Sequence, residues 1–265
     1  MPTITANAPT TSDGIAGRVA VVTGAAQGIG AATCAALSAR GAKVAAMDMQ
    51  ADPLRHLADN LAGTQPYVTD VRDGPTVEAS IAAVEREIGP IDILVNIAGT
   101  LHTGAVTELT DEAWRQAFAV NADGVFHTAR AVARRMITRR SGVIVTVASN
   151  AASVPRTHMA AYAASKAAAV MLTRCLGLEL GPLGIRANIV SPGSTDTAMQ
   201  RQLWTEPDSA ETVIRGSLER FRTGIPLGRI AEASDIADAV VFLASNRARH
   251  ITLQELIVDG GASLR

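Results

Sequence analysis

Hydrophobic residues in this chain fall into short runs rich in Val and Ile, which alternate with longer alanine-rich stretches. Apolar runs bounded by Gly, Pro, Asn or Asp indicate buried strands, and longer stretches with apolar positions three and four apart indicate helices. The pattern predicts strands at residues 19–23, 43–48, 66–70, 91–96, 142–149, 186–191 and 255–259. It predicts helices at residues 28–40, 76–88, 111–138, 160–180 and 234–244.

Alternating strands and helices favour right-handed crossovers and a parallel sheet with helices on both faces. We therefore expect an α/β fold, with a single doubly wound Rossmann-type domain over residues 17–265 and a seven-stranded parallel sheet. Residues 1–16, rich in Thr, Ala and Pro, predict a flexible leader. Residues 196–228 interrupt the alternation after a strand and predict a helical substrate lid, although a plain surface excursion is the alternative.

Composition agrees with a large buried core, because 48% of residues are hydrophobic and 18% are charged. The net charge of −1 and the scattered basic residues give no reason to expect a nucleic acid or membrane partner. Cys34 and Cys175 lie in alanine- and leucine-rich stretches, with no CxxC and no cluster of His and Cys at metal-ligand spacing. They predict buried free thiols, no metal site and a cytoplasmic location.

The sequence VVTGAAQGIG joins the first predicted strand to the first predicted helix. Gly24 permits a tight turn, Gly28 lets the backbone approach a pyrophosphate, and Gly30 allows close packing of the helix. Gln27 and Ile29 belong to the same turn. Because the amides at the start of a helix attract anions, this turn predicts a dinucleotide site.

Asp48 ends the second predicted strand. A carboxylate at this position accepts hydrogen bonds from both ribose hydroxyls of the adenosine half and repels a 2′-phosphate. The neighbours that could hold such a phosphate, Gln27 and Met49, are not basic. The pattern predicts NAD as the cofactor in preference to NADP, and the alternative is an Asp that caps the following turn.

Tyr162 and Lys166 stand four residues apart in a predicted helix and so lie on one face of it. A phenol with a pKa of about 10 is a weak base at neutral pH, but an adjacent cation favours the phenolate. Ser149, at the end of a predicted strand, can donate a hydrogen bond to the same substrate oxygen. These three residues predict removal of a proton from an alcohol while hydride leaves its carbon.

Several motifs in this order resemble the short-chain dehydrogenase/reductase family from residue 18 onward. They are TGAAQGIG at 23–30, Asp70, NIAG at 96–99, Asn121, Ser149, YAASK at 162–166 and SPGSTDT at 191–197. Members of the family usually have NNAG where this chain has NIAG, so Ile97 removes one polar contact that would steady the central strand.

The resemblance implies further roles at both ends of the cofactor. It implies that Asn121 kinks its helix and holds a water molecule that relays protons from Lys166 to solvent. By the same resemblance, Tyr162 and Lys166 also contact the cofactor. Three further groups are implied: Asp70 and Val71 at the adenine, Asn96, Ala98 and Gly99 at the nicotinamide ribose, and Pro192, Gly193, Thr195 and Thr197 around the carboxamide and phosphates.

The C-terminal half has a closer resemblance, carried by VPRTHMAAYAASK, SPGSTDTAMQRQLW, GIPLGRIAEASDIADAVVFLAS and HITLQELIVDGG. These stretches are similar to the 2,3-dihydro-2,3-dihydroxybenzoate dehydrogenases of catechol siderophore biosynthesis. The similarity implies a small substrate, a cyclohexadiene with vicinal hydroxyls and a carboxylate. It also implies a homotetramer.

A carboxylated substrate needs a cationic partner in a site as apolar as this one. Arg156 lies six residues before the tyrosine of YAASK, and its guanidinium fork could bind a carboxylate through two hydrogen bonds. Gln200 and Arg201 are the competing donors. Met159 and Met199 pack on the substrate ring or serve as ordinary core residues.

Other functions are compatible with the same motifs. One alternative is a 3-oxoacyl-thioester reductase or a sugar or polyol dehydrogenase on the same scaffold. Asp48 argues against a carrier-protein reductase, because such enzymes usually use NADP. The alternative outside the enzymes is a nucleotide-sensing regulator, but such proteins typically lose the tyrosine or the lysine, and both are present in this chain.

Overall fold

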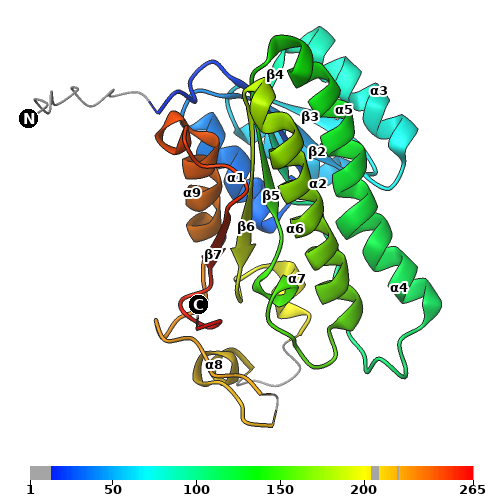
Figure 1. The fold of residues 1–265 in the computed structure, drawn as a ribbon, viewed down its shortest axis with the longest axis vertical. Coiled ribbons are helices and arrows are strands. Elements are labelled where there is room, and N and C mark those ends of the chain that lie inside the picture. Colours follow the sequence, from blue (N-terminus) through cyan, green and yellow to red (C-terminus); the bar gives the residue numbers. More distant parts are fainter. Residues whose placement is uncertain (1–12, 204–208, 220, 265) are drawn as a thin grey trace, which may run out of the picture.

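The computed structural model describes residues 13–203, 209–219 and 221–264 (Figure 1). In these residues the chain forms a seven-stranded sheet in the order β3-β2-β1-β4-β5-β6-β7, and all neighbouring strands are parallel. The predicted α/β fold is therefore confirmed. The strands are β1 (Val19–Thr23), β2 (Lys43–Asp48), β3 (Thr64–Val68), β4 (Ile91–Asn96), β5 (Gly142–Val147), β6 (Ile185–Pro192) and β7 (Glu255–Val258).

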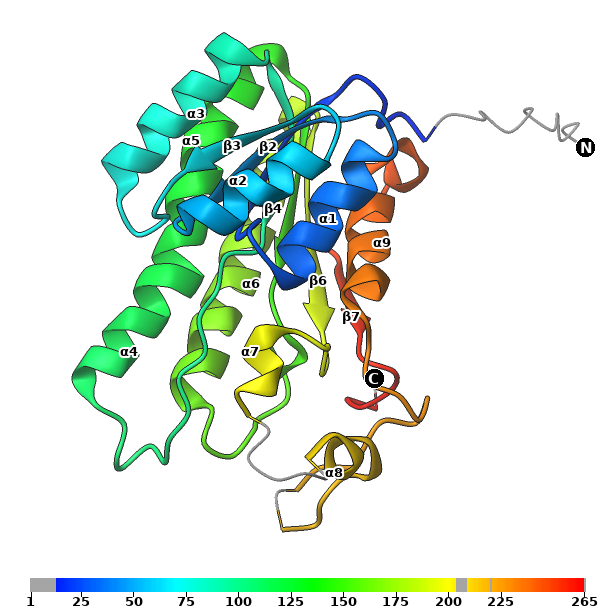
Figure 2. The same ribbon diagram turned by 180° about the vertical axis from the view of Figure 1, so that it is seen from behind.

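Helices cover both faces of the sheet (Figures 1 and 2). Apolar residues of α1, α2 and α9 form one core with one face of the sheet, and those of α3, α5 and the end of α6 form a second core with the other face. The helices are α1 (Gly28–Ser38), α2 (Ala51–Asn60), α3 (Gly74–Glu87), α4 (Asp111–Phe118), α5 (Gly124–Arg139), α6 (Ala160–Leu180), α7 (Ala198–Arg201), α8 (Ser209–Arg215) and α9 (Ala233–Ala244).

Strand β1 shows how a fully buried strand serves both cores. Ala20 and Val22 pack in the core that includes α1 and α9, whereas Val19 and Val21 pack in the core that includes α3 and α5. Successive side chains of a strand point to opposite faces, so a strand covered on both faces is a continuous apolar run. This explains why the hydrophobic runs identified the strands.

Several predicted boundaries are shifted by one or two residues, α2 was not predicted, and two differences have a clear physical reason. The helix predicted over 111–138 consists of α4, a π-helical turn at Ala119–Asp123, and α5. A π turn inserts one residue into a helix and shifts its direction. Strand β3 begins two residues before the predicted start, and Pro66 lies inside it. This is tolerated because β3 is an edge strand that pairs only with β2.

Two further expectations need correction. Cys34 is buried, as predicted, but Cys175 is exposed, because it lies about 200° around α6 from the buried Thr173. Residues 13–16 do not belong to a flexible leader, since the side chain of Ile15 is fully buried and the Asp13 carbonyl accepts a hydrogen bond from the amide of Asn246 at 2.8 Å. The rest of the predicted leader, residues 1–12, lies outside the described residues.

The strand order reverses between β1 and β4. From β1 the chain builds outward through β2 and β3, and then returns to the other side of β1 to form β4. In open parallel sheets, ligands bind in the crevice outside the carboxyl ends of the strands at such a switch point. No helix in the described part of the chain is both long enough and apolar enough to cross a bilayer.

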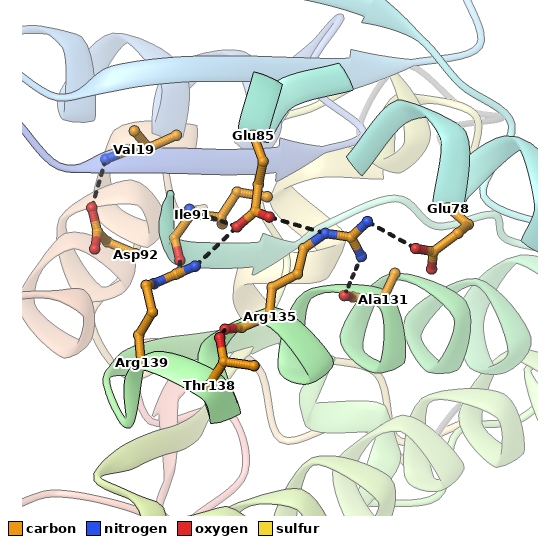
Figure 3. Close-up of polar contacts among 9 residues, drawn as sticks. All are labelled: Val19, Glu78, Glu85, Ile91, Asp92, Ala131, Arg135, Thr138 and Arg139. Atoms are coloured by element: carbon orange, nitrogen blue, oxygen red, sulfur yellow. Dashed lines mark hydrogen bonds and ion pairs between the residues drawn. The ribbon is translucent and has the colours of Figure 1, made fainter. Parts of the chain in front are cut away.

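An ion-pair cluster joins α3 to α5 and the start of β4 (Figure 3). Arg135 lies 3.2 Å from Glu85 and 2.8 Å from Glu78, and Arg139 lies 2.9 Å from Glu85 and also donates to the carbonyl oxygen of Ile91. The side chains of Arg135, Glu85 and Arg139 are 19%, 26% and 29% exposed. Because solvent reaches them only in part, these contacts are screened less than those of an exposed pair.

We expect Glu85→Gln to lower the free energy of unfolding by about 1–3 kcal/mol, because it weakens charge-assisted hydrogen bonds to two half-buried guanidiniums. Asp52→Asn is the control, since Asp52 pairs with Arg55 on the surface of α2 and both side chains are exposed. Its loss should not exceed about 1 kcal/mol. Urea denaturation measures both variants, and equal losses would contradict the stabilising role of the cluster.

Candidate active site

A cavity of about 490 Å³ lies at the carboxyl ends of the strands. Its walls come from the loops that follow β1 to β6, from the start of α6 and from the predicted lid. All five predicted substrate residues line it, namely Ser149, Arg156, Met159, Met199 and Gln200. So do all the predicted cofactor residues except Asn96, namely Gly24, Gln27, Gly28, Ile29, Gly30, Asp48, Met49, Asp70, Val71, Ala98, Gly99, Tyr162, Lys166, Pro192, Gly193, Thr195 and Thr197.

The glycine turn after β1 packs too closely for side chains. Gly24 and Gly28 have φ values of 67° and 54°, which favour glycine. A β-carbon on Gly30 would lie 1.9 Å from the carbonyl oxygen of Gly24, and one on Gly24 would lie 2.7 Å from the amide nitrogen of Ala98. The bare backbone at the start of α1 therefore lines the cavity, as a cradle for a pyrophosphate requires.

The loop after β4 is tied to β1. The Thr23 hydroxyl accepts hydrogen bonds from the amides of Ile97 and Ala98, at 3.0 and 3.2 Å. Asn96, predicted at the nicotinamide ribose, does not line the cavity. Its side chain points toward α5, where its Oδ1 accepts a hydrogen bond from Thr128 at 2.7 Å. The reason is the alternation along β4, which turns Asn96 to the same face as the buried Leu94.

Asp48 accepts hydrogen bonds from the local backbone and also lines the cavity. Its two carboxylate oxygens accept hydrogen bonds from the amides of Ala26 and Gln50, at 3.1 and 3.0 Å. The contact to Gln50 is the turn cap that was the alternative to a ribose contact. Each oxygen of a carboxylate has a second lone pair, so these contacts leave acceptor capacity on a residue that lines the cavity.

Sequence reasoning missed Arg72, which lines the cavity beside Asp70. The Arg72 guanidinium donates to both carboxylate oxygens of Asp70, at 3.0 and 2.6 Å. The hydrogen bond from Arg72 is the main cause that lowers the pKa of Asp70. The two-residue spacing of opposite charges was visible in the sequence, but it does not say that the arginine faces the cavity.

Tyr162, Lys166 and Ser149 meet between α6 and the end of β5, and all three are buried. Ser149 forms a side-chain hydrogen bond with the Tyr162 hydroxyl. Lys166 Nζ donates to the carbonyl oxygen of Val147 at 3.0 Å and lies 5.9 Å from the centroid of the Tyr162 ring. The structure thus brings together the three residues that the sequence predicted to act as a unit.

The electrostatics of this trio differ in one respect from the expectation. Burial raises the pKa of Tyr162, and the hydrogen bond from Ser149 opposes that shift. Burial also lowers the pKa of Lys166 to about 8. We expected Lys166 to favour the phenolate, but its ammonium is directed toward the carbonyl of Val147, and desolvation is the dominant effect on the phenol.

Asn121 lies in the π-helical turn, which agrees with the predicted kink. Its side chain is fully buried and bonded to Thr100 N, Thr100 O and Ser165 Oγ, at 2.9, 3.0 and 2.9 Å. A β-carbon on Gly99 would lie 3.2 Å from Asn121 Oδ1 and 3.3 Å from Lys166 Nζ. Asn121 does not line the cavity, and the geometry shows it as a residue that positions α6 against the loop after β4.

Residues after β6 close the other side of the glycine turn. Thr197 caps α7 by accepting a hydrogen bond from the amide of Gln200 at 3.2 Å, and its methyl group would lie 3.2 Å from a β-carbon on Gly28. Gly193 passes close to Asp259, because a β-carbon on Gly193 would lie 2.6 Å from the β-carbon of Asp259. Two segments far apart in the sequence thus form one narrow wall.

The residues predicted to donate hydrogen bonds to the substrate carboxylate differ in their position relative to the cavity. Burial lowers the pKa of Arg156, and Asp259 acts in the opposite direction. Arg201 does not line the cavity, because it is exposed and pairs with Asp196 at 2.7 Å, so its prediction as a donor was wrong. Arg222 does line it, and sequence reasoning missed it because the surrounding pattern is weak.

Comparisons with known proteins decide the family. A family model described as enoyl-(acyl carrier protein) reductase matches residues 24–263. A 2,3-dihydro-2,3-dihydroxybenzoate dehydrogenase of Bacillus subtilis (strain 168) is 55% identical over 95% of this chain and 98% of its own length. The enzyme of the same name from Escherichia coli (strain K12) is 46% identical over 92% and 96%. The chain belongs to the short-chain dehydrogenase/reductase family.

The fold agrees with this assignment. A solved short-chain type dehydrogenase/reductase from Mycobacterium marinum has a TM-score of 0.88 with this chain at 31% identity, and the match covers 96% of this chain and 98% of that one. Short-chain dehydrogenases/reductases typically use NAD or NADP. The residues present fit such a dinucleotide, because the bare turn at Gly24 and Gly30 admits phosphates where any side chain would clash.

We expect Gly30→Ala to abolish NAD binding and to lower the free energy of unfolding by about 1–3 kcal/mol, because the new methyl group overlaps the Gly24 carbonyl. Gly181→Ala is the matched control, since a β-carbon there meets no atom within 4 Å. Calorimetric titration with NAD and thermal unfolding measure the two effects. Normal NAD binding by the Gly30 variant would contradict the proposed close approach.

Proposed function

We propose that this protein oxidises 2,3-dihydro-2,3-dihydroxybenzoate to 2,3-dihydroxybenzoate with NAD, as a step of catechol siderophore biosynthesis. The observation that carries the proposal is that two relatives, similar over nearly their whole length, are named for this reaction. The geometry is consistent with it, since Ser149, Tyr162 and Lys166 line one cavity together with Arg156. The chain is accordingly an alcohol-oxidising enzyme.

The proposed reaction needs a base, a hydride acceptor and a stabilised oxygen. Tyr162 Oη takes the proton of one ring hydroxyl while the C–H bond at the same carbon breaks, and Ser149 Oγ donates to the developing carbonyl oxygen. When bound, NAD supplies the positively charged nicotinamide ring that accepts the hydride. The ketone then tautomerises to the aromatic catechol, which makes the overall oxidation strongly favourable.

We propose that the charge of Lys166 and the hydrogen bond from Ser149 together offset part of the effect of burial on the phenol. Burial alone raises the pKa of Tyr162 and disfavours the phenolate. With a pKa of about 8, Lys166 is mostly protonated at neutral pH and keeps one positive charge close to the phenol ring. We propose that Lys166 also binds the nicotinamide ribose. Because the Asn121 side chain is bonded to Thr100 and Ser165, we propose that the backbone of Asn121 holds the water that relays protons from Lys166.

We propose NAD as the natural cofactor because of the charges at the adenosine end of the cavity. Asp48 lines this end, and its carboxylate would repel a 2′-phosphate. Arg72 is the basic residue nearby that could attract such a phosphate, but it is already held by both oxygens of Asp70. The same argument disfavours a carrier-protein reductase that uses NADP.

We also propose that the protein is a homotetramer, built through α4, α5, α6 and the C-terminal strand β7. Large apolar side chains are exposed on these helices, as an interface between copies requires. They are Trp114, Phe126, Ile137, Met171 and Leu178. Sedimentation equilibrium measures the number of copies, and a monomer in solution would contradict the proposal.

We expect the enzyme to reduce NAD in the presence of 2,3-dihydro-2,3-dihydroxybenzoate, with the appearance of catechol absorbance, and to react poorly with simple cyclohexanols. Tyr162→Phe should lower kcat by about 10²–10⁴-fold and leave NAD binding intact. Since the phenolate is the active form, kcat/KM of the wild type should fall as pH drops below the Tyr162 pKa. Unchanged turnover in the Phe variant would exclude Tyr162 as the base.

We expect Asp48→Asn to reduce the preference for NAD over NADP, measured as the ratio of kcat/KM values, by about tenfold or more. Asn keeps the shape of the side chain and removes the charge that repels a 2′-phosphate. Asp52→Asn, an exposed acidic residue of the neighbouring helix, is the control. A ratio that stays constant in Asp48→Asn would refute the ribose contact.

A further inference from the structure

We propose that Arg222 recognises the carboxylate of the substrate, together with Arg156, and so determines the specificity of the enzyme for an acidic diol. This inference rests on the proposed function, and it assigns a role to a residue that the sequence pattern did not reveal. Arg222 lines the same cavity as Tyr162 and Arg156. Its guanidinium Nη2 lies 3.8 Å from the sulfur of Met159.

The contact with Met159 places the guanidinium at the reacting end of the cavity. Met159 directly precedes α6, three residues before Tyr162 and three residues after Arg156. Both arginines and Tyr162 therefore line one cavity around Met159. Guanidinium is the group best suited to bind a carboxylate, because its planar fork matches the two oxygens.

The backbone around Arg222 is held in a hairpin by hydrogen bonds and by two glycines. Ser217 and Arg222 exchange amide-to-carbonyl hydrogen bonds, both 2.9 Å long. Gly216 and Gly224 both have positive φ, and β-carbons on them would lie 2.5 Å from the Arg222 carbonyl oxygen and 2.6 Å from the Ile214 carbonyl oxygen. Only glycine permits this close approach, so the position of Arg222 follows from the backbone.

The hairpin exposes apolar side chains and partly buries a charged one, which is the reverse of the usual arrangement. Leu218 and Phe221 are 95% and 86% exposed, whereas Arg222 is half-buried and lines the cavity. Phe221 also has a φ of 52°, a conformation that is rare for an aromatic residue. A segment that exposes apolar groups and turns a cation toward a cavity fits a role for that cation in binding an anionic ligand.

The surroundings of Arg156 show why a second guanidinium is needed. Asp259 acts on Arg156 electrostatically, so part of the positive charge of Arg156 is offset before any substrate binds. Asp259 itself is fixed by hydrogen bonds from Asn150 at 3.1 Å and Ser263 at 2.5 Å, and it is not displaced easily. Arg222 brings a second guanidinium from the segment after β6 to the cavity that Arg156 lines.

Two diols that differ only in the carboxylate test this inference: 2,3-dihydro-2,3-dihydroxybenzoate and 3,5-cyclohexadiene-1,2-diol. In Arg222→Gln, KM for the acid should rise by about tenfold or more, while kinetics with the uncharged diol change by less than about twofold. Arg222→Lys should recover part of the loss, because it restores the charge without the fork. NAD affinity and thermal unfolding should match the wild type.

Arg215→Gln is the matched control, since Arg215 lies at the end of α8, pairs with Glu211 and does not line the cavity. This variant should show unchanged kinetics with both diols. Equal losses for the two diols in Arg222→Gln, or no loss for either, would overturn the inference. A wild-type enzyme that shows no preference for the acid would instead overturn the proposed function, so the two failures are distinguishable.

Discussion

Parallel pairing of the strands is the constraint on which this site depends, because it brings the carboxyl ends of β1, β4, β5 and β6 to one edge of the sheet. The two hydrogen bonds that Thr23 accepts from the loop after β4 join this edge at the point where the strand order reverses. The glycine turn then leaves bare backbone at the start of α1. The candidate dinucleotide site therefore depends on the order of the strands and on the glycines of this turn, which have no side chains.

Burial of Tyr162 and Lys166 shapes the chemistry at the reacting end of the cavity and disfavours the charged forms of both side chains. Tyr162 and Lys166 are removed from water, and desolvation acts on both toward the neutral form. The structure offsets this cost locally, through the hydroxyl of Ser149 and the carbonyl of Val147. Asn121 holds the neighbouring loop with three hydrogen bonds and keeps α6 in place. These contacts position the trio within the fold itself.

Charge is distributed differently at the two ends of the cavity. At the adenosine end, acidic side chains dominate, and Arg72 is engaged by Asp70. At the substrate end, Arg156 and Arg222 face a space lined by Met159 and apolar neighbours. This polarity matches a cofactor bound through ribose hydroxyls and a small anionic substrate. It links the proposed cofactor preference and the proposed substrate to one electrostatic pattern of the protein.

The sequence by itself determined the alternation of strands and helices, the glycine turn and the Ser149–Tyr162–Lys166 trio, because hydrophobic period, glycine spacing and helical spacing are local properties. It did not determine which way Asn96 points, that Cys175 is exposed, or that Arg222 reaches the cavity while Arg201 pairs with Asp196. These outcomes depend on contacts between residues far apart in the chain, or on backbone angles in irregular segments. Only the tertiary structure decided them, since no periodic pattern records the direction of a single side chain.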